Sequence, residues 1–179
     1  MSYFDTYGPL YIERDDGAFQ GQQAAFWNDV ESRYEGLTSA IGCYTFCLEY
    51  RGVIKPWYVG RTWAIKGFRG EVFELHKRNI YNDILQSRRG RPLIFLFPLI
   101  SAEKYQFSKS RKSSKRVIEW LEIQLMGFAH KRNSEISNVK DMTFLRNVEV
   151  LGLIGRRRGR PFREAQAIRH ALLGGPKPK

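Results

Sequence analysis

Short apolar runs separated by Gly and Pro form the main pattern in the first two thirds of the chain. Residues 40–60 contain two such runs on either side of the turn-forming segment 49–56, which predicts a β-hairpin. Residues 93–100 form a continuous apolar run after a Gly-Arg-Pro segment, and its length and aromatic content favour a buried strand. We expect this run to be the third strand of one small sheet.

Apolar residues at helical spacing predict helices on either side of the last strand. The segment 66–88 predicts one helix with an interruption near Asn79, and the segment 115–131 predicts a second long helix. A shorter amphipathic helix is expected just before Gly36. The pattern thus alternates between strands and helices along one compact domain.

The two ends of the chain differ from the centre in composition. We interpret residues 1–39 as an acidic extension that packs on a central domain at 40–140. Residues 141–179 are interpreted as a basic extension, with a short strand at 148–154 and a last helix at 162–173. A length of 179 residues fits one domain with such extensions.

Several classes of protein are disfavoured by the composition. No apolar run approaches the roughly 20 residues of a membrane span, and the first residues lack the layout of a secretory signal. Cys43 and Cys47 are four positions apart in a predicted strand, about 13 Å if extended, which is too far for a disulfide. We therefore expect a cytoplasmic protein with reduced thiols and no membrane partner.

The charge distribution points to a polyanionic partner. The chain has 30 Lys and Arg against 18 Asp and Glu, for a net charge of +12. Residues 1–36 hold seven acidic and two basic residues, so that the remaining chain carries 28 basic and 11 acidic residues, a net charge of +17. A body this basic suggests nucleic acid as the partner.

Two tripeptides in the predicted hairpin add specific chemistry to this picture. Gly42-Cys43-Tyr44 and Tyr58-Val59-Gly60 each place a tyrosine on one arm of the hairpin. Arg69 follows on the next helix and Glu122 lies in a later one. In this order and spacing the residues resemble the GIY-YIG nuclease family, over about residues 40–138.

The resemblance implies a fold and an activity. The fold implied is of the α+β class, a small three-stranded antiparallel sheet flanked by helices. The activity implied is a metal-dependent endonuclease that hydrolyses phosphodiester bonds in DNA with one divalent ion, Mg²⁺ or Mn²⁺. Such an ion binds phosphate oxygens directly and needs few carboxylates from the protein.

The residue types fit the parts of that reaction. Glu122 is the candidate metal ligand, and the planar guanidinium of Arg69 can hold two phosphate oxygens. Tyr44 and Tyr58 are candidates for the general base and its hydrogen-bonding partner, and we favour Tyr44 as the base. A free phenol has a pKa of about 10, so a nearby Arg, metal or second base must lower that pKa or take the proton onward.

Some assignments stay open at this stage. His76 comes seven residues after Arg69, where it can act as a proton shuttle or simply face solvent; the family's His position is Phe73 here. Glu119 competes with Glu122, and the family context favours Glu122. Cys43 replaces the usual aliphatic residue, which a small apolar thiol can do.

Candidate nucleic-acid contacts come from the basic clusters and from the late asparagine of the family, for which Asn138 fits better than Asn133. The candidates are Arg61, Lys77, Arg78, Asn138, Arg156, Arg157 and Arg158. The competing readings are an inactive nucleic-acid-binding module on the same fold and an RNA-binding basic protein. Cleavage of both DNA strands would favour a homodimer.

Overall fold

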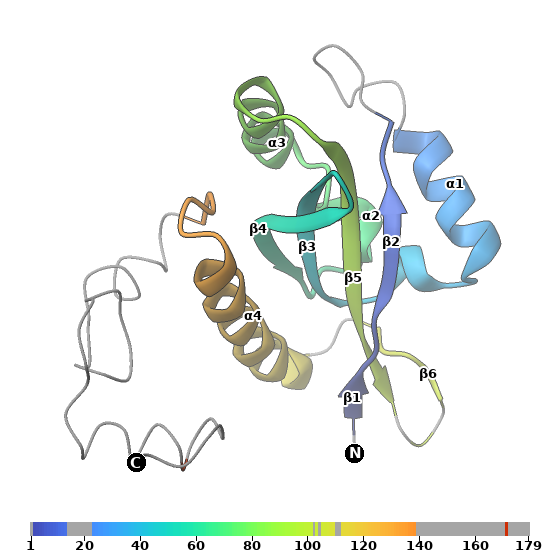
Figure 1. The fold of residues 1–179 in the computed structure, drawn as a ribbon. Helices are drawn as coiled ribbons and strands as arrows, with labels where there is room; N and C mark the ends of the chain where they lie inside the picture. Colours follow the sequence, from blue (N-terminus) through green and yellow to red (C-terminus); the bar gives the residue numbers. More distant parts are fainter. Residues whose placement is uncertain are drawn as a thin grey trace. The chain divides into compact units, whose positions relative to one another are not determined.

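The computed structural model describes residues 2–13, 23–101, 103, 105–109, 112–138 and 171 (Figure 1). The chain divides into two compact units, Met1–Ser137 and Asn138–Lys179, and the elements below belong to the first. The strands are β1 (Ser2–Phe4), β2 (Tyr7–Tyr11), β3 (Gly42–Tyr50), β4 (Val53–Thr62), β5 (Arg91–Ser101) and β6 (Gln106–Phe107). The helices are α1 (Gln23–Arg33), α2 (Gly67–Glu71), α3 (Leu75–Ser87) and α4 (Lys112–Arg132), with a 3₁₀ turn, η1 (Leu37–Ser39). The strand predicted at 148–154 lies outside the described residues, as does the helix predicted at 162–173 except for residue 171.

The sheet is antiparallel and is organised around β5. Its strand order is β1-β5-β3-β4, and β2 and β6 also pair with β5, which gives six strands. The α+β class with an antiparallel sheet is therefore confirmed, whereas the expected number of three strands is too small. The three predicted strands correspond to β3, β4 and β5.

The N-terminal strands were missed because their sequence looks like a loop. β2 contains Gly8-Pro9 in only five residues, and β1 has three residues. β2 pairs with residues 93–96 of β5, on the edge opposite to β3, and β1 pairs with residues 99–101, beyond the part of β5 that pairs with β3. This pairing joins residues about 90 positions apart in the chain, which local patterns do not report.

The predicted hairpin is confirmed. β3 and β4 are joined by Arg51 and Gly52, which have φ values of 52° and 75°. Two consecutive positive φ values are typical of a type I′ turn, whose twist matches that of the paired strands. Glycine adopts this conformation without steric cost, which explains Gly52.

The helix predicted at 66–88 is divided into α2 and α3, and the break is at 72–74 rather than near Asn79, which lies inside α3. The reason is packing: Val72 and Phe73 in the break are both buried. The ring of Phe73 lies 5.7 Å from that of Trp27 of α1 and 6.5 Å from that of Tyr81 of α3. The turn between the helices lets residues on both sides of it enter one core.

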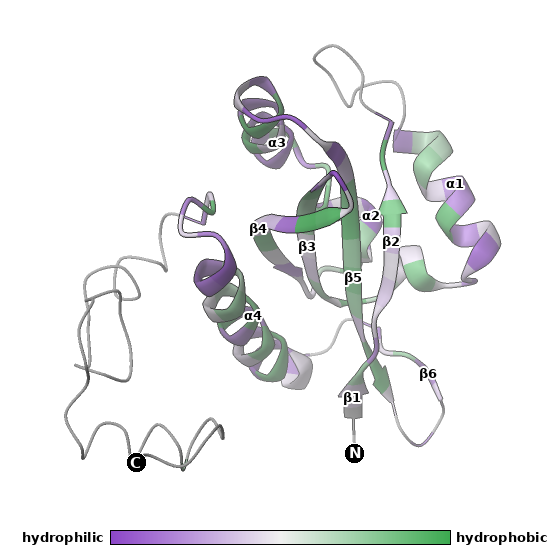
Figure 2. Ribbon diagram, viewed as in Figure 1, coloured by the Kyte–Doolittle hydropathy of each residue, from purple (hydrophilic) through white to green (hydrophobic). Residues whose placement is uncertain are grey.

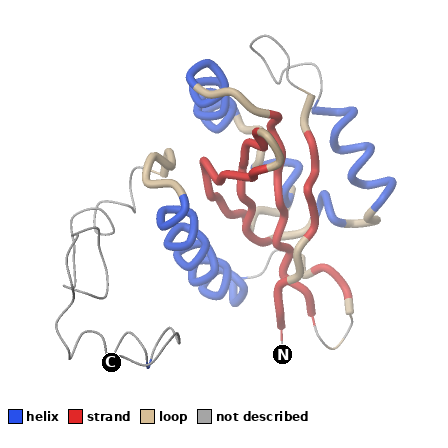
Figure 3. The backbone as a smooth tube through the Cα atoms, viewed as in Figure 1, coloured by secondary structure: helices blue, strands red, loops and turns tan. Residues whose placement is uncertain are grey.

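The helices cover both faces of the sheet (Figure 3). The larger core cluster joins α1, α2 and α3 to one face, where Trp27, Phe46 and Tyr81 are buried. The smaller cluster joins Cys43 of β3 to Ile118 of α4 on the other face. The central strands are accordingly the most hydrophobic part of the fold (Figure 2). Among the described residues, no helix is long and apolar enough to cross a membrane.

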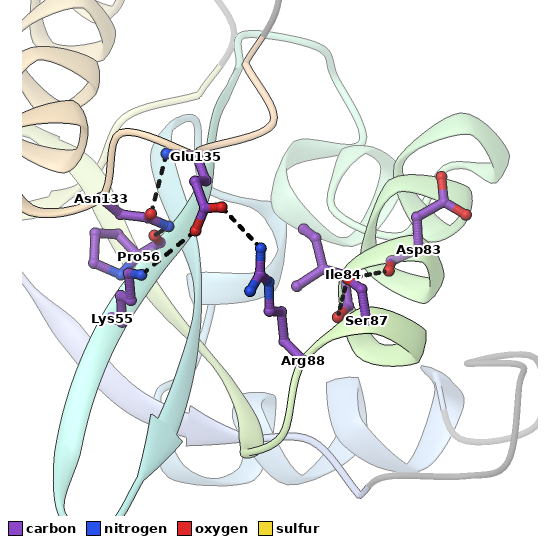
Figure 4. Close-up of polar contacts among 8 residues, drawn as sticks. All are labelled: Lys55, Pro56, Asp83, Ile84, Ser87, Arg88, Asn133 and Glu135. Carbon is purple, nitrogen blue, oxygen red and sulfur yellow. Dashed lines mark hydrogen bonds and ion pairs between the residues drawn. The ribbon is translucent and has the colours of Figure 1, made fainter.

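The C-terminal end of α4 is fixed to β4 (Figure 4). Asn133 is buried, its side-chain amide donates to the carbonyl oxygen of Pro56 at 2.8 Å, and its own oxygen accepts from the backbone of Glu135 at 3.1 Å. The Glu135 carboxylate pairs with Arg88 at 2.9 Å and with Lys55 at 3.9 Å. These contacts set the position of α4 along β4, and with it the position of Glu122.

Candidate functional site

The two motif tyrosines lie side by side on one face of the hairpin. Tyr58 pairs with Phe46 and Gly60 pairs with Tyr44, so alternate residues of both strands share this face. The rings of Tyr44 and Tyr58 are 6.3 Å apart between centroids and tilted by 38°. The structure therefore brings the two phenols together, as the sequence predicted.

Gly60 makes room for the first tyrosine. A Cβ atom at Gly60 would lie 2.4 Å from both Cζ and Oη of Tyr44. The phenol of Tyr44 therefore lies directly over the backbone of the second motif. Only glycine allows this approach without displacing the ring.

A third phenol, which the sequence analysis did not single out, completes the cluster. The ring of Tyr81 stacks on Phe46 at 4.2 Å and meets Tyr58 edge-on at 5.9 Å. Tyr81 is fully buried, as is Tyr44, whereas Tyr58 is half-buried. The signal for Tyr81 was its helical spacing from Ile84 and Leu85, with which it shares the buried side of α3.

The environment keeps all three phenols protonated, but to different degrees. Burial raises the pKa of Tyr44 and of Tyr81 well above the usual value; the Tyr58 phenol raises both further, while the hydrogen bond with Tyr44 lowers the pKa of Tyr81. Burial, and then the Glu122 carboxylate, raise the pKa of Tyr58 to about 12, while Tyr44 and Arg61 lower it. Tyr58 is thus the motif phenol with solvent access and with a cation that favours its ionised form.

Glu122 is a buried carboxylate held by an arginine. Its residue is 8% exposed, and the Arg61 guanidinium at the end of β4 forms an ion pair with its carboxylate. The same guanidinium lies 3.5 Å from the Glu119 carboxylate and 4.9 Å from the ring centroid of Trp63. Lys115 approaches Glu119 at 3.9 Å. Alternating charges therefore connect the first half of α4 to the end of β4.

Glu122 also acts electrostatically on groups from other elements. Its charge contributes to the raised pKa values of Tyr44, Tyr58 and Cys43, and it raises the pKa of Lys77. These residues belong to β3, β4 and α3. β4 is the last strand in the order β1-β5-β3-β4, which is why α3 and α4 can both reach its outer edge. The candidate site lies there.

Lys77 is a buried cation within this site. The residue is 5% exposed, and its ammonium group forms an ion pair with Glu71 and lies 3.6 Å from Glu74. Burial lowers the pKa of Lys77 to about 8, against the opposing effect of Glu122. The sequence analysis expected a surface DNA contact here. Its spacing of four and seven residues from the buried Tyr81 and Ile84 was the signal for an inward position.

The structure also describes four other predicted site residues, Arg69, His76, Arg78 and Asn138. Arg69 is exposed on α2. The pKa of Glu31 is lowered mainly by the hydrogen bond from Thr38, and the charge of Arg69 lowers it slightly further. His76 is exposed and lies 3.7 Å from Glu74. Arg78 is half-buried, as is Asn138.

The remaining predicted contacts, Arg156, Arg157 and Arg158, lie outside the described residues.

Cys43 occupies a buried position on β3. Its thiol donates to the carbonyl oxygen of Ile118 at 3.3 Å and packs with Ile41 and Leu99. Cys43 and Cys47 are both free and buried, which confirms the prediction of no disulfide between them. Burial raises the pKa of both thiols, to about 12 for Cys47.

The carboxylates at the site could hold a hard divalent cation that takes few ligands from the protein. Within the described part of the chain, no group of three or more His, Cys, Asp or Glu side chains is arranged to hold a metal ion. Glu122 alone offers a buried carboxylate, with Glu119 one turn away. Mg²⁺ retains several waters and is often bound through one or two carboxylates and substrate phosphates, so this donor set fits such an ion.

No family model, curated protein or solved structure matches the chain. The resemblance to the GIY-YIG nucleases thus rests on the motif residues of the sequence alone.

Proposed function

We propose that the protein is a metal-dependent endonuclease of the GIY-YIG type that hydrolyses phosphodiester bonds in DNA. The observation that carries the proposal is the convergence of Tyr58, Glu122 and Arg61 at the outer edge of β4, with Tyr44 beneath. A buried carboxylate beside phenols and an arginine is costly to form and has no evident use in simple packing. The basic chain supports a polyanionic substrate.

The reaction requires a new bond from water oxygen to phosphorus and cleavage of the bond to the leaving sugar oxygen. We assign Tyr58 as the group that accepts the water proton, after its phenol has released its own proton to solvent, because it is the motif phenol with solvent access. Tyr44 lies behind it and orients it. Arg61 is placed to stabilise the negative charge that develops on the phosphate oxygens.

Glu122 is the residue that would hold the divalent ion, and Glu119 is the nearest second carboxylate. When bound, such an ion supplies charge neutralisation at the phosphate and lowers the pKa of nearby hydroxyl groups and water. Arg61 forms an ion pair with Glu122, so the protein holds this carboxylate in place before substrate arrives. Arg69 is the second proposed phosphate contact, reached from the exposed side of α2.

A nicking assay tests the proposal. Purified wild type is incubated with supercoiled DNA in Mg²⁺ or in chelator, beside Glu122→Gln, Glu119→Gln and Arg69→Ala. We expect nicking only with Mg²⁺, a loss of about 10³-fold or more for Glu122→Gln, and a much smaller loss for Glu119→Gln. The Glu119 variant is the matched control because it removes a neighbouring carboxylate that also contacts Arg61.

The outcomes separate the competing functions. Nicking by Glu122→Gln, or by wild type in chelator, would contradict the mechanism. Tight DNA binding without nicking on any DNA structure would indicate an inactive binding module. A preference for RNA in competition, again without cleavage, would indicate an RNA-binding protein.

A further inference from the structure

The outward side of α4 carries an apolar surface that the proposed site does not use. Val117, Trp120, Ile123 and Phe128 are 37%, 58%, 55% and 69% exposed. Their helix buries Ile118, Glu122, Met126 and Ala129 instead. At 3.6 residues per turn, Trp120 lies on the side of α4 opposite to the buried set, and the other three exposed apolar residues flank it, with the exposed Gln124 on the same side. We call these four apolar residues together with Gly127 the outer face of α4.

The outer face contains both a projection and a notch. Trp120 is its largest side chain, and Gly127 lies seven residues later, almost on the same line along the helix. A Cβ atom at Gly127 would meet nothing within 4 Å. Glycine inside a helix costs about 1 kcal/mol relative to alanine. The large exposed side chain of Trp120 and the missing side chain of Gly127 therefore lie along the same side of α4.

A projection and a notch on the same line make a surface that is complementary to itself. A two-fold axis between positions 123 and 124 places Trp120 opposite the partner's Gly127, because the two residues lie equally far from that axis. The symmetry repeats the contact, so that both indoles enter notches. Self-complementarity of this kind is what a two-fold interface requires.

We propose that the outer face of α4 is a homodimer interface, in which two α4 helices cross antiparallel and each Trp120 packs over the partner's Gly127. Ile123 lies near the two-fold axis and joins the contact. Glu122 points to the opposite side of the helix, so both candidate sites stay free. The inference concerns an interaction surface and does not depend on the proposed nuclease activity.

The basic residues at the two ends of the outer face predict a weak dimer whose affinity increases with salt concentration. The same axis places Arg116 opposite the partner's Lys131, and both residues are exposed. Several hundred Å² of apolar surface per copy gives a total at or below about 1,000 Å², the low end for specific interfaces. Salt screens the repulsion, so the dimer should tighten with ionic strength, whereas a polyanion bound here would dissociate.

Sedimentation velocity on the full chain, without DNA or metal, tests the proposal. Wild type is measured at about 1 to 100 µM and at about 0.1 and 0.5 M salt. We expect a concentration-dependent dimer that is stronger at high salt. Trp120→Ala and Gly127→Leu should each weaken it about tenfold or more, and Ile65→Ala, which removes an exposed apolar side chain elsewhere, should not.

Two variants keep the test independent of folding. Gly127→Leu fills the notch with a better helix former, so its monomer should be at least as stable as wild type while its dimer is weaker. Exchanging the two residues, Trp120→Gly with Gly127→Trp, preserves the antiparallel complementarity and should restore the dimer. A wild type that stays monomeric at both salt concentrations would overturn the proposal. So would a dimer that Gly127→Leu leaves intact, or one that the exchange does not restore.

Discussion

The phenol of Tyr44 lies directly over the backbone of Gly60, on the neighbouring strand: a Cβ atom at Gly60 would lie 2.4 Å from Tyr44 Oη. The two motifs of the hairpin are therefore one packing unit, in which the glycine of the second receives the tyrosine of the first. Because Tyr44 is fully buried, its ring has no free space into which to move.

Gly60→Ala should consequently destabilise the fold. Overpacking of this kind costs about 1–3 kcal/mol, and displacement of Tyr44 would also disturb Tyr58. Urea unfolding of the two proteins measures the change. Gly127→Ala is the control, since its added methyl group meets open space and should raise stability by up to about 1 kcal/mol. Equal stability of Gly60→Ala and wild type would show that the ring can shift freely.

The hairpin could be predicted from sequence because its determinants are local. The turn at Arg51 and Gly52, the alternation of side chains and the two tyrosines all act within about twenty residues. The additional strands depended on the distant strand β5 and could not be inferred from their own composition. Residue type alone singled out Glu122 as a candidate, and the structure places it buried beside Arg61.

The candidate site was less predictable from the sequence where burial decides the role of a residue. His76 and Lys77 are neighbours on α3, and sequence favoured the histidine because of its ordinary pKa. In the structure His76 is exposed and Lys77 is buried. Helical phase decides this difference, and the phase depended on the break between α2 and α3.

Lys77→Met should destabilise the protein through the Glu71 carboxylate that it leaves behind. Breaking a buried ion pair on one side costs roughly 3 kcal/mol, because the remaining charge is uncompensated. The Lys77 and Glu71 side chains are 6% and 20% exposed. Lys77→Met combined with Glu71→Gln should recover much of the loss, and a double-mutant cycle by urea unfolding measures the coupling.

The control for this cycle is the exposed pair of Lys55 and Glu135, at 3.9 Å. Lys55→Met should change stability by less than about 1 kcal/mol. If Lys77→Met were as mild as Lys55→Met, the buried ammonium group would not depend on Glu71.

The two motif tyrosines should differ in their effect on catalysis. Tyr58→Phe removes the solvent-accessible hydroxyl group and should lower kcat by about 10²–10⁴, the usual contribution of a general base, with DNA affinity preserved. Tyr44→Phe should have a smaller effect, because its hydroxyl group acts through Tyr58. Single-turnover nicking and a DNA-binding titration separate the two quantities. A larger loss of kcat for Tyr44→Phe would reverse the assignment.

Stability should fall steeply at alkaline pH. Burial raises the pKa of the thiols of Cys43 and Cys47 and of the phenols of Tyr44, Tyr58 and Tyr81, so the unfolded chain releases these protons first. Their stabilising contribution is complete below the pKa of the unfolded groups, 9.0 for the thiols and 10.0 for the phenols, and is lost above it. Each group costs about 1.4 kcal/mol per pH unit in that range.

Lys77 acts in the opposite direction. Its pKa is lowered to about 8 from 10.5, so the unfolded chain holds more protons between these values and this group alone makes stability rise with pH. One lysine against two thiols leaves a net loss above pH 9.0, and the phenols steepen the loss above pH 10.0. Urea unfolding in reducing buffer from about pH 8 to pH 11 measures the profile. Cys47→Ala should flatten the first part of the decline. An unfolding free energy that instead rises with pH, as Lys77 alone would make it, would show that the buried thiols and phenols ionise in the folded protein as they do in the unfolded chain.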